Sequence, residues 1–416
     1  MKMKQIIPIM LIASAPLTGM AQNKSGIVVD NLDKTANPTE DFYKFATGGW
    51  QKNNPLPAAY SRFGSFDQLQ EDNNKRINAI LSELLKKNYK AGTTEYKLSE
   101  FYKQAMDSVR RNEEGVRPVM PILNEMEAAK TLADLRKVQL NHPVAGYGIP
   151  LGYGFGADEK NAKMNILQIS QGGLTLGLKE YYLDNDAATK TIRDAYKQHI
   201  VKMFKLFGFD EAEATAKRDA IMRFETSVAL ISKNRTELRD VEANYNKTTL
   251  EAFKNDYPNI PLEEMANAEG IKSEYLKDIV VGQPTFLAGV DKLLSVLNAD
   301  DLRAIMEWDA ILSAASYLSD DIQAANFEFF GKVMRGRQED YPRWKRATNQ
   351  VESQMGEALG KMYCERYFPA SSKKRMEQLV KNLQIALGER IKAQDWMSDE
   401  TKHAALDKLA SFYVKI

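Results

Sequence analysis

The chain has 416 residues, of which 44% are hydrophobic, 27% charged and 9% aromatic, a composition that excludes a disordered or fibrous protein. Its 57 lysines and arginines against 56 aspartates and glutamates give a formal net charge of +1, so no overall field favours nucleic acid or an anionic membrane. The single cysteine, Cys364, excludes an intramolecular disulfide and a thiolate zinc cluster.

The N-terminus has the pattern of a secretory signal peptide. Two lysines precede a mostly apolar run over residues 6–20, and small residues follow near Ala21. We therefore expect residues 1–21 to be removed near Ala21 and the protein to be exported to the periplasm or the extracellular space, with no lasting membrane span. Residues 22–37 are expected to be a polar lead-in.

Most of the remaining chain is patterned for helices. Apolar residues recur at helical spacing, and capping residues such as Thr131, Asp210 and Ser398 stand ahead of several segments. No fixed repeat or low-complexity linker divides the interior, so we predict one mainly α-helical lobe over residues 38–395. The expected helices lie near residues 37–50, 65–85, 95–109, 118–127, 132–140, 189–207, 211–232, 248–256, 287–297, 300–318, 321–334, 343–367, 372–394 and 398–414.

One segment is patterned differently. Five glycines lie between residues 146 and 156, and an alternating stretch at 164–169 follows them. We predict a small sheet or hairpin here, the one β-rich island in the first half. The glycines match no phosphate-binding motif, so tight turns and aromatic packing are a better reason for them than nucleotide binding.

The residues that could hold a metal or catalyse a reaction are few. None of the three histidines, His142, His199 and His403, belongs to an H-E-x-x-H helix, so we expect no catalytic residue and no metal ligand within this chain. Glu400 and His403 have a ligand-like spacing, but no second copy exists, which favours an exposed helix face. His199 is expected at the surface or half-buried, and Cys364 is expected to be packed.

Two charged groups allow alternative interpretations. The basic residues between 332 and 346 could grip phosphate, but interleaved acidic residues favour a solvated, ion-paired face. Arg62 lies just ahead of a helix start, signalled by a possible capping box at 65–68, and Asp67 lies in the first turn. The pair could bind a carboxylate, or it could be a structural salt bridge.

Several segments resemble the neprilysin-type zinc metallopeptidases, a group that includes endothelin-converting enzymes and bacterial oligopeptidases. The similar segments are NPTEDFYKFATGGW at 37–50, RFGSFD at 62–67, QISQGGLTLGLKEYYL at 168–183, RTELRDVEANYNKTTLEAF at 235–253 and EALGKMYCERYFPASSKKRMEQLVKNLQIALGERIKAQDWM at 357–397. Together they cover nearly the whole chain after the expected signal peptide, in order.

The resemblance implies a mainly helical, two-lobed peptidase in which one lobe carries zinc and the other encloses the substrate. This sequence matches the enclosing lobe, with residues 396–416 starting the connection to a catalytic lobe that is missing from the chain. We therefore expect the N-terminal lobe of an exported zinc metalloendopeptidase or oligopeptidase that hydrolyses short peptides. Zn²⁺ is expected in the full-length enzyme only, and the chain alone should be inactive. The alternatives are a standalone, non-catalytic peptide-binding module and a two-chain enzyme.

The resemblance also assigns substrate-binding residues. Arg62 and Asp67 match the family's pair that holds the substrate's C-terminal carboxylate, and Phe66 matches an aromatic residue that lines the nearby pocket. Gln70 stands where some members carry a further arginine, which implies a weaker preference for free C-termini.

Overall fold

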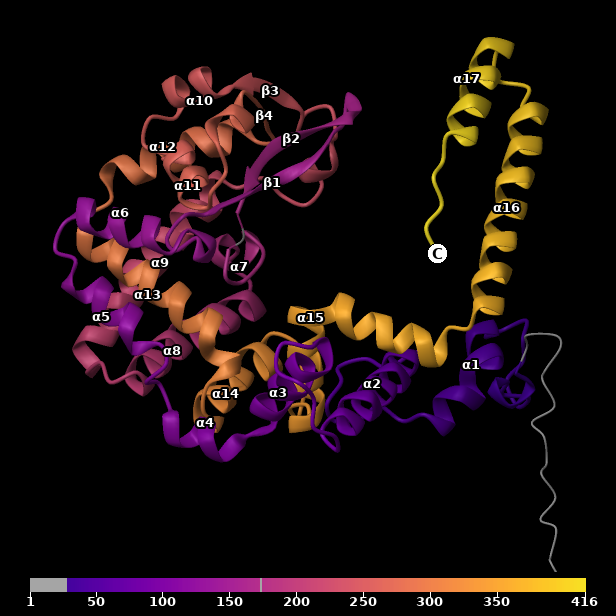
Figure 1. The fold of residues 1–416 in the computed structure, drawn as a ribbon, viewed down its shortest axis with the longest axis horizontal. Helices are drawn as coiled ribbons and strands as arrows, with labels where there is room; N and C mark the ends of the chain where they lie inside the picture. Colours follow the sequence, from indigo (N-terminus) through magenta and orange to yellow (C-terminus); the bar gives the residue numbers. More distant parts are fainter. Residues whose placement is uncertain (1–27, 173) are drawn as a thin grey trace, which may run out of the picture. The chain divides into compact units, whose positions relative to one another are not determined.

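The computed structural model describes residues 28–172 and 174–416. The expected signal peptide and the beginning of the lead-in therefore lie outside the described residues. The described part contains 17 α-helices and one four-stranded sheet, so the prediction of a mainly α-helical fold with a small sheet is confirmed (Figure 1). Within the same ranges, no helix combines the length and apolar content needed to cross a bilayer.

The chain folds into two compact units. The first contains residues up to Pro57 together with Arg62–Ser65. In this unit α1 (Phe42–Asn53) begins after Asp41, whose carboxylate accepts a hydrogen bond from the backbone of Lys44. A Cβ at position 49 would lie 2.4 Å from the carbonyl oxygen of Asp30, so only glycine fits where α1 contacts the preceding turn.

The second unit contains residues 58–61 and 66–416. The helices that follow α1 are α2 (Ser65–Leu84), α3 (Thr94–Met106), α4 (Ser108–Glu114), α5 (Met120–Ala128), α6 (Leu132–Asn141), α7 (Glu180–Leu183), α8 (Ala187–Leu206), α9 (Glu211–Ile231), α10 (Leu250–Asp256), α11 (Leu262–Ala268), α12 (Pro284–Val296), α13 (Ala299–Ala314), α14 (Asp320–Asn326), α15 (Arg343–Tyr367), α16 (Ala370–Ala393) and α17 (Asp399–Ala410).

Local capping chemistry explains where several helices begin. Thr131 and Asp210 form capping boxes at α6 and α9, and Ser398 caps α17, as the sequence predicts. The helix expected over 95–109 is two helices, because Asp107 ends α3 and caps α4. Ser65 is the first residue of α2 and not the capping residue before it. The helix therefore begins one residue earlier than the possible capping box at 65–68 implies.

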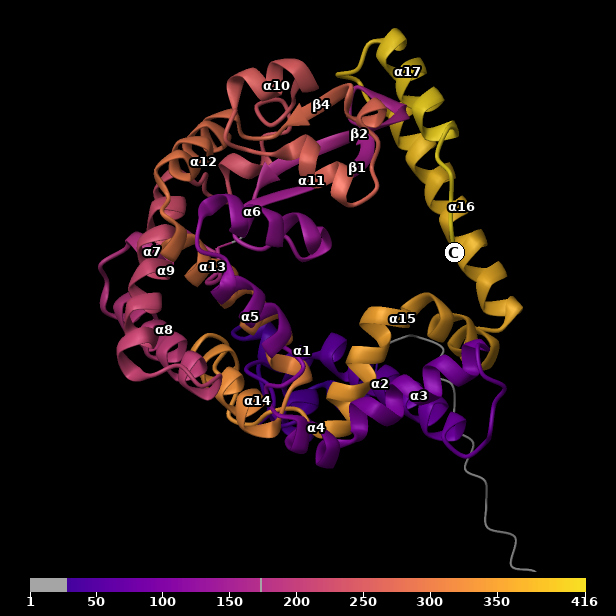
Figure 2. The same ribbon diagram turned by 60° about the vertical axis from the view of Figure 1, so that its left-hand side comes forward.

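The sheet has the strand order β1-β2-β4-β3 (Figure 1), and Figure 2 shows β1, β2 and β4 from another side. Strands β1 (Leu151–Asp158) and β2 (Asn161–Gln171) form the expected antiparallel hairpin. The sheet is not confined to the first half of the chain, however, because β4 (Asp278–Val281) adds in parallel to β2 and β3 (Asn246–Thr249) adds antiparallel to β4. Both added strands have only four residues, too few to show an alternating pattern.

The second unit has two hydrophobic cores. The larger joins the sheet with helices from α5 to α14 and has the fully buried Trp308 and Phe204 near its centre. The smaller lies between α2, α3 and α15, around Leu81 and Leu98. Two predictions were wrong: His199 is buried, with its ring stacked on Phe329, and Cys364 is exposed. A helix face predicted from one turn alone cannot show which neighbour covers it.

Candidate functional site

The first turn of α2 carries two of the three predicted substrate-binding residues. Phe66 is 86% exposed, a large value for an aromatic side chain, and Leu69 in the same turn is also exposed. Asp67 is half-buried and lies in the first turn, where a negative charge is stabilised by the helix dipole. This turn therefore presents an apolar side chain beside a carboxylate.

The third predicted residue, Arg62, belongs to the first unit, and its side chain is exposed. The next residue, Phe63, stacks on Trp50 of α1 with the ring centroids 6.1 Å apart. This contact fixes the segment that carries Arg62 against α1. The structure thus brings Phe66 and Asp67 together on one helical turn and holds Arg62 on a separate, anchored segment.

A buried lysine fixes the start of α2. Lys345 of α15 is 4% exposed, and its ammonium donates hydrogen bonds to Glu71 of α2 and, at 2.7 Å, to the hydroxyl of Tyr60. Its nitrogen also lies 3.8 Å from the ring centroid of Tyr341. Burial alone would raise the pKa of Glu71, but the hydrogen bonds from Lys345 and Tyr60 outweigh it and lower that pKa. Glu71 is therefore held as a carboxylate, one turn beyond Asp67.

The loop before α15 binds the segment that precedes Arg62. The carbonyl oxygen of Ala58 accepts hydrogen bonds from the backbone nitrogens of Gln338 and Glu339, at 2.9 and 3.1 Å. Arg337 donates to the carbonyl oxygen of Ala59 at 2.9 Å, and its guanidinium lies 3.9 Å from the ring centroid of Tyr341. Residues 58–61 are thus tied to the loop before α15 by backbone and side-chain contacts together.

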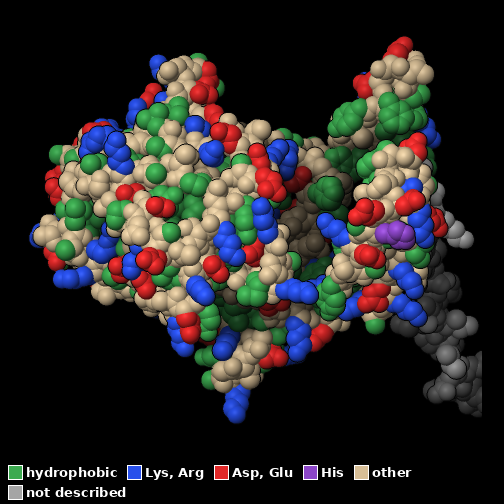
Figure 3. Space-filling model, turned by 90° about the horizontal axis from the view of Figure 1, so that it is seen from above, with side chains coloured by type: hydrophobic (Ala, Val, Ile, Leu, Met, Phe, Trp, Pro, Cys, Tyr) green, Lys and Arg blue, Asp and Glu red, His purple; other side chains and the backbone are tan. Residues whose placement is uncertain are grey.

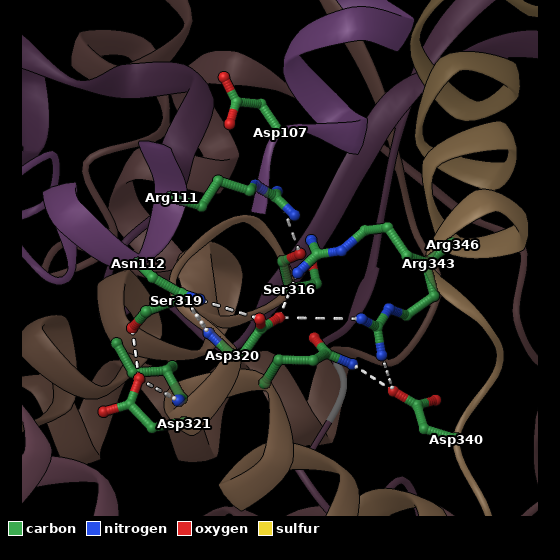
Figure 4. Close-up of polar contacts among 12 residues, drawn as sticks. Asp107, Arg111, Asn112, Ser316, Ser319, Asp320, Asp321, Asp340, Arg343 and Arg346 are labelled. Atoms are coloured by element: carbon green, nitrogen blue, oxygen red, sulfur yellow. Dashed lines mark hydrogen bonds and ion pairs between the residues drawn. The ribbon is translucent and has the colours of Figure 1, made fainter. Parts of the chain in front are cut away.

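A network of ion pairs continues from this loop to α14, and hydrogen bonds between Asn112 and Asp320 extend it to α4 (Figure 4). Asp340 accepts from Arg346 at 2.6 Å, and Asp320 accepts from Arg343. Burial and the neighbouring guanidinium groups of Arg343 and Arg346 lower the pKa of Arg111, which among the described residues donates one long bond, to the backbone carbonyl of Ser316. The ion pairing expected for this basic segment is present, but the expectation of a solvated face is wrong for Lys345.

The larger core contains carboxylates that no sequence pattern singles out. Glu225 of α9 accepts hydrogen bonds from the hydroxyls of Thr175, Tyr182 and Tyr196, at 2.5, 2.9 and 3.1 Å. Burial raises the pKa of Glu225 to about 7 despite these bonds. Glu225 and Asp309 both line a cavity of about 80 Å³, and burial raises the pKa of Asp309 to about 6. Each of the two is a single acidic residue within a helical pattern, which is why the sequence gives no signal for them.

The described residues offer no metal site of the usual kind. Over 28–172 and 174–416, no group of three or more histidine, cysteine, aspartate or glutamate side chains is arranged to hold a metal ion. The zinc site that the resemblance implies for the family therefore does not fit the residues described here. What the start of α2 offers chemically is binding: an exposed aromatic ring, a carboxylate and a rigid support.

Comparison with known proteins gives consistent matches over this chain. The family model described as peptidase family M13 matches residues 38–416. Endothelin-converting enzyme 1 of Rattus norvegicus is 28% identical over 410 residues, which are 95% of this chain and 53% of the rat protein. An endothelin-converting enzyme homolog of Locusta migratoria is 27% identical, over 92% of this chain and 54% of its own length. The chain thus spans about half the length of these curated relatives.

Solved structures show the same fold. The zinc metalloprotease Zmp1 of Mycobacterium tuberculosis, in complex with an inhibitor, matches with a TM-score of 0.86 and 27% identity, over 92% of this chain and 58% of that one. PepO of Lactobacillus rhamnosis matches with a TM-score of 0.76 and 23% identity, over 90% of this chain and 59% of that one, a likeness that concerns the fold alone.

Proposed function

The chain belongs to peptidase family M13, and on this premise we propose that it is the N-terminal, substrate-enclosing region of an exported zinc-dependent peptidase that cleaves short peptides. The observation that carries the proposal is the family match along residues 38–416, joined to relatives about half of whose length the chain spans. Export is supported by the signal-peptide pattern of residues 1–21.

In this proposal the zinc ligands come from outside the chain. The described residues supply no group able to hold the ion, and the sequence contains no H-E-x-x-H. We therefore expect this chain to be inactive alone. Its contribution to the reaction is to bind and orient the peptide.

Three residues are proposed to contact the substrate. The exposed guanidinium of Arg62 is suited to bind the C-terminal carboxylate of a peptide, because arginine binds carboxylates with two parallel hydrogen bonds. Phe66 would contact an apolar side chain of the peptide. The family resemblance pairs Asp67 with Arg62 in holding the peptide's C-terminal carboxylate, and Asp67 lies one turn before Glu71, which Lys345 contacts.

Replacing Arg62 by alanine in the full-length enzyme should raise KM about tenfold for peptides with a free C-terminus, since a charge-assisted hydrogen bond is lost. The same peptides with an amidated C-terminus should change little. Steady-state kinetics on matched acid and amide substrates measure the difference. Arg110→Ala is the control, because Arg110 is exposed and already paired with Glu114. An equal rise in KM for acid and amide would remove the carboxylate role.

The hairpin of α16 and α17 is the proposed contact with the catalytic lobe. The two helices pack on each other, yet none of their residues is buried. Exposed hydrophobic side chains are visible on this part of the surface, at the right of Figure 3. A groove of about 470 Å³ is lined by Leu383, Leu387 and Phe412. A surface of this kind in a family of longer proteins indicates a place for further chain to pack.

A standalone peptide-binding module remains the second candidate, supported by the exposed Phe66 and the rigid α2 start. The intact mass of the native exported protein, with peptide mapping of its C-terminus, separates the two. A mass larger by a whole lobe and peptides beyond Ile416 support the peptidase proposal. A C-terminus at Ile416 supports the binding module or a two-chain enzyme, in either of which zinc assays on this chain alone should be blank.

A further inference from the structure

A second candidate binding site lies away from the α2 start, between α6, α11 and α12. A cavity of about 390 Å³ opens there, within the range of small-molecule sites. Its apolar lining includes Leu140 of α6, Leu262 of α11 and Leu294 of α12. The charged side chains that line it are Arg136, Lys254 and Glu264.

Arg136 is the polar group that gives this cavity its chemistry. Among the described residues its guanidinium makes one hydrogen bond, to Oε1 of Gln139 at 3.2 Å, and no carboxylate there lies within 4.0 Å of it. Gln139 is buried and fixed in turn by a 2.6 Å bond to the carbonyl oxygen of Tyr147. Since a guanidinium has five N–H donors, most of those on Arg136 have no protein acceptor. Burial lowers the pKa of Arg136, which agrees with a poorly solvated charge.

The wall opposite α6 is rigid. Asn259 donates from its backbone nitrogen and from its side-chain amide to the carboxylate of Asp291, at 2.6 and 3.0 Å. Prolines at 258 and 261 restrict the backbone on both sides of Asn259. The ammonium of Lys254 is held by Glu263 at 2.7 Å. A preformed wall lowers the entropy cost of binding a ligand.

We propose that this cavity binds a small ligand that carries a carboxylate next to an apolar group. The carboxylate pairs with Arg136, which then gains the acceptors it lacks, and the apolar group lies against Leu140, Leu262 and Leu294. The charge of Lys254 is already balanced by Glu263, and the exposed carboxylate of Glu264 opposes an anion, so Arg136 is the group that attracts the ligand. The site is independent of the peptidase proposal.

Binding of N-acetyl-L-leucine and of its amide, N-acetyl-L-leucinamide, to the full protein tests the proposal by calorimetry and by the shift in unfolding temperature. The acid should bind at least tenfold more tightly than the amide. Arg136→Gln should remove this preference, because it removes the charge. Lys137→Gln is the matched control: it lies on the same helix, is exposed and is close to Asp134.

Glu264→Gln measures how strongly the nearby carboxylate opposes the ligand, and the unaltered protein separates a ligand site from an internal ion pair. If the cavity binds a carboxylate, removing the like charge of Glu264 should tighten binding of the acid. If Glu264 instead pairs with Arg136 in solution, the acid should bind no better than the amide in the unaltered protein. That result would overturn the proposal, and so would an acid preference retained in Arg136→Gln or no binding of the acid by the unaltered protein.

Discussion

Replacing Lys345 by methionine is expected to lower the free energy of unfolding by about 3 kcal/mol, because it leaves Glu71 partly buried without its cation. The substitution also removes the hydrogen bond to Tyr60 and the contact with the ring of Tyr341. Methionine fills a similar volume, so the loss reports on charge and hydrogen bonding rather than on a cavity. Urea unfolding at pH 7, followed by circular dichroism, measures the change.

Two further variants test the role of this buried pair. Lys332→Met removes an ammonium that pairs with Glu328 at 2.7 Å on an exposed face, and it should cost below about 1 kcal/mol. Replacing Lys345 and Glu71 together by methionine should recover much of the stability, since no charge is then left unpaired. The buried pair would not have the expected role if Lys345→Met cost no more than Lys332→Met.

The helical architecture could be predicted from sequence because its signals are local. The pairing of Asp210 with Glu213 at the start of α9 depends on residues three positions apart, and the structure contains that capping box. β3 and β4 could not be predicted, because strands of four residues form only when a distant partner supplies the hydrogen bonds. The π-helix over Phe327–Val333 likewise has no signal within the expected helix 321–334.

The site residues divide in the same way. Arg62, Phe66 and Asp67 are predicted from a family resemblance, since the residue types of Arg62 and Asp67 alone also fit a structural salt bridge. The burial and the hydrogen bonds of Lys345 and Glu225 depend on partners far away in the sequence. Glu71 is 274 positions from Lys345, and the hydroxyl of Tyr196 is 29 positions from Glu225. A helical pattern shows that such residues are charged, but not that another helix covers them.

The unaltered protein is expected to lose about 3 kcal/mol of unfolding free energy through Glu225 as pH rises from 5 to 8, because one pKa unit corresponds to about 1.4 kcal/mol. Glu225→Gln should remove this part of the pH dependence. Burial raises the pKa of Glu225 from its ordinary value of 4.5 to about 7. Below pH 4.5 both the folded and the unfolded forms are protonated. As pH rises to 7 the unfolded chain releases the proton first, so the stabilising contribution of the neutral carboxyl is lost over this window.

Two titrating groups that are not coupled to Glu225 act in the same experiment but cancel in the comparison. Burial raises the pKa of Glu307 to about 8, which adds to the loss of stability with rising pH. Burial lowers the pKa of His199 to about 3, so His199 destabilises the fold as pH falls below 6.5. Both are present in the unaltered protein and in Glu225→Gln, so they cancel in the difference between the two proteins. Asp309 interacts electrostatically with Glu225 and itself has a pKa of about 6, so the difference reports on Glu225 together with its coupling to Asp309.

Urea unfolding at half-unit intervals from pH 5 to pH 8 measures this difference. Glu263→Gln is the matched control, because the hydrogen bond from Lys254 lowers the pKa of Glu263 and places its titration below the window. The difference between the unaltered protein and the control should stay constant with pH, whereas that for Glu225→Gln should change by about 3 kcal/mol. A constant difference for Glu225→Gln as well would mean that the three hydroxyl donors keep this carboxylate ionised throughout, and that burial does not dominate its pKa.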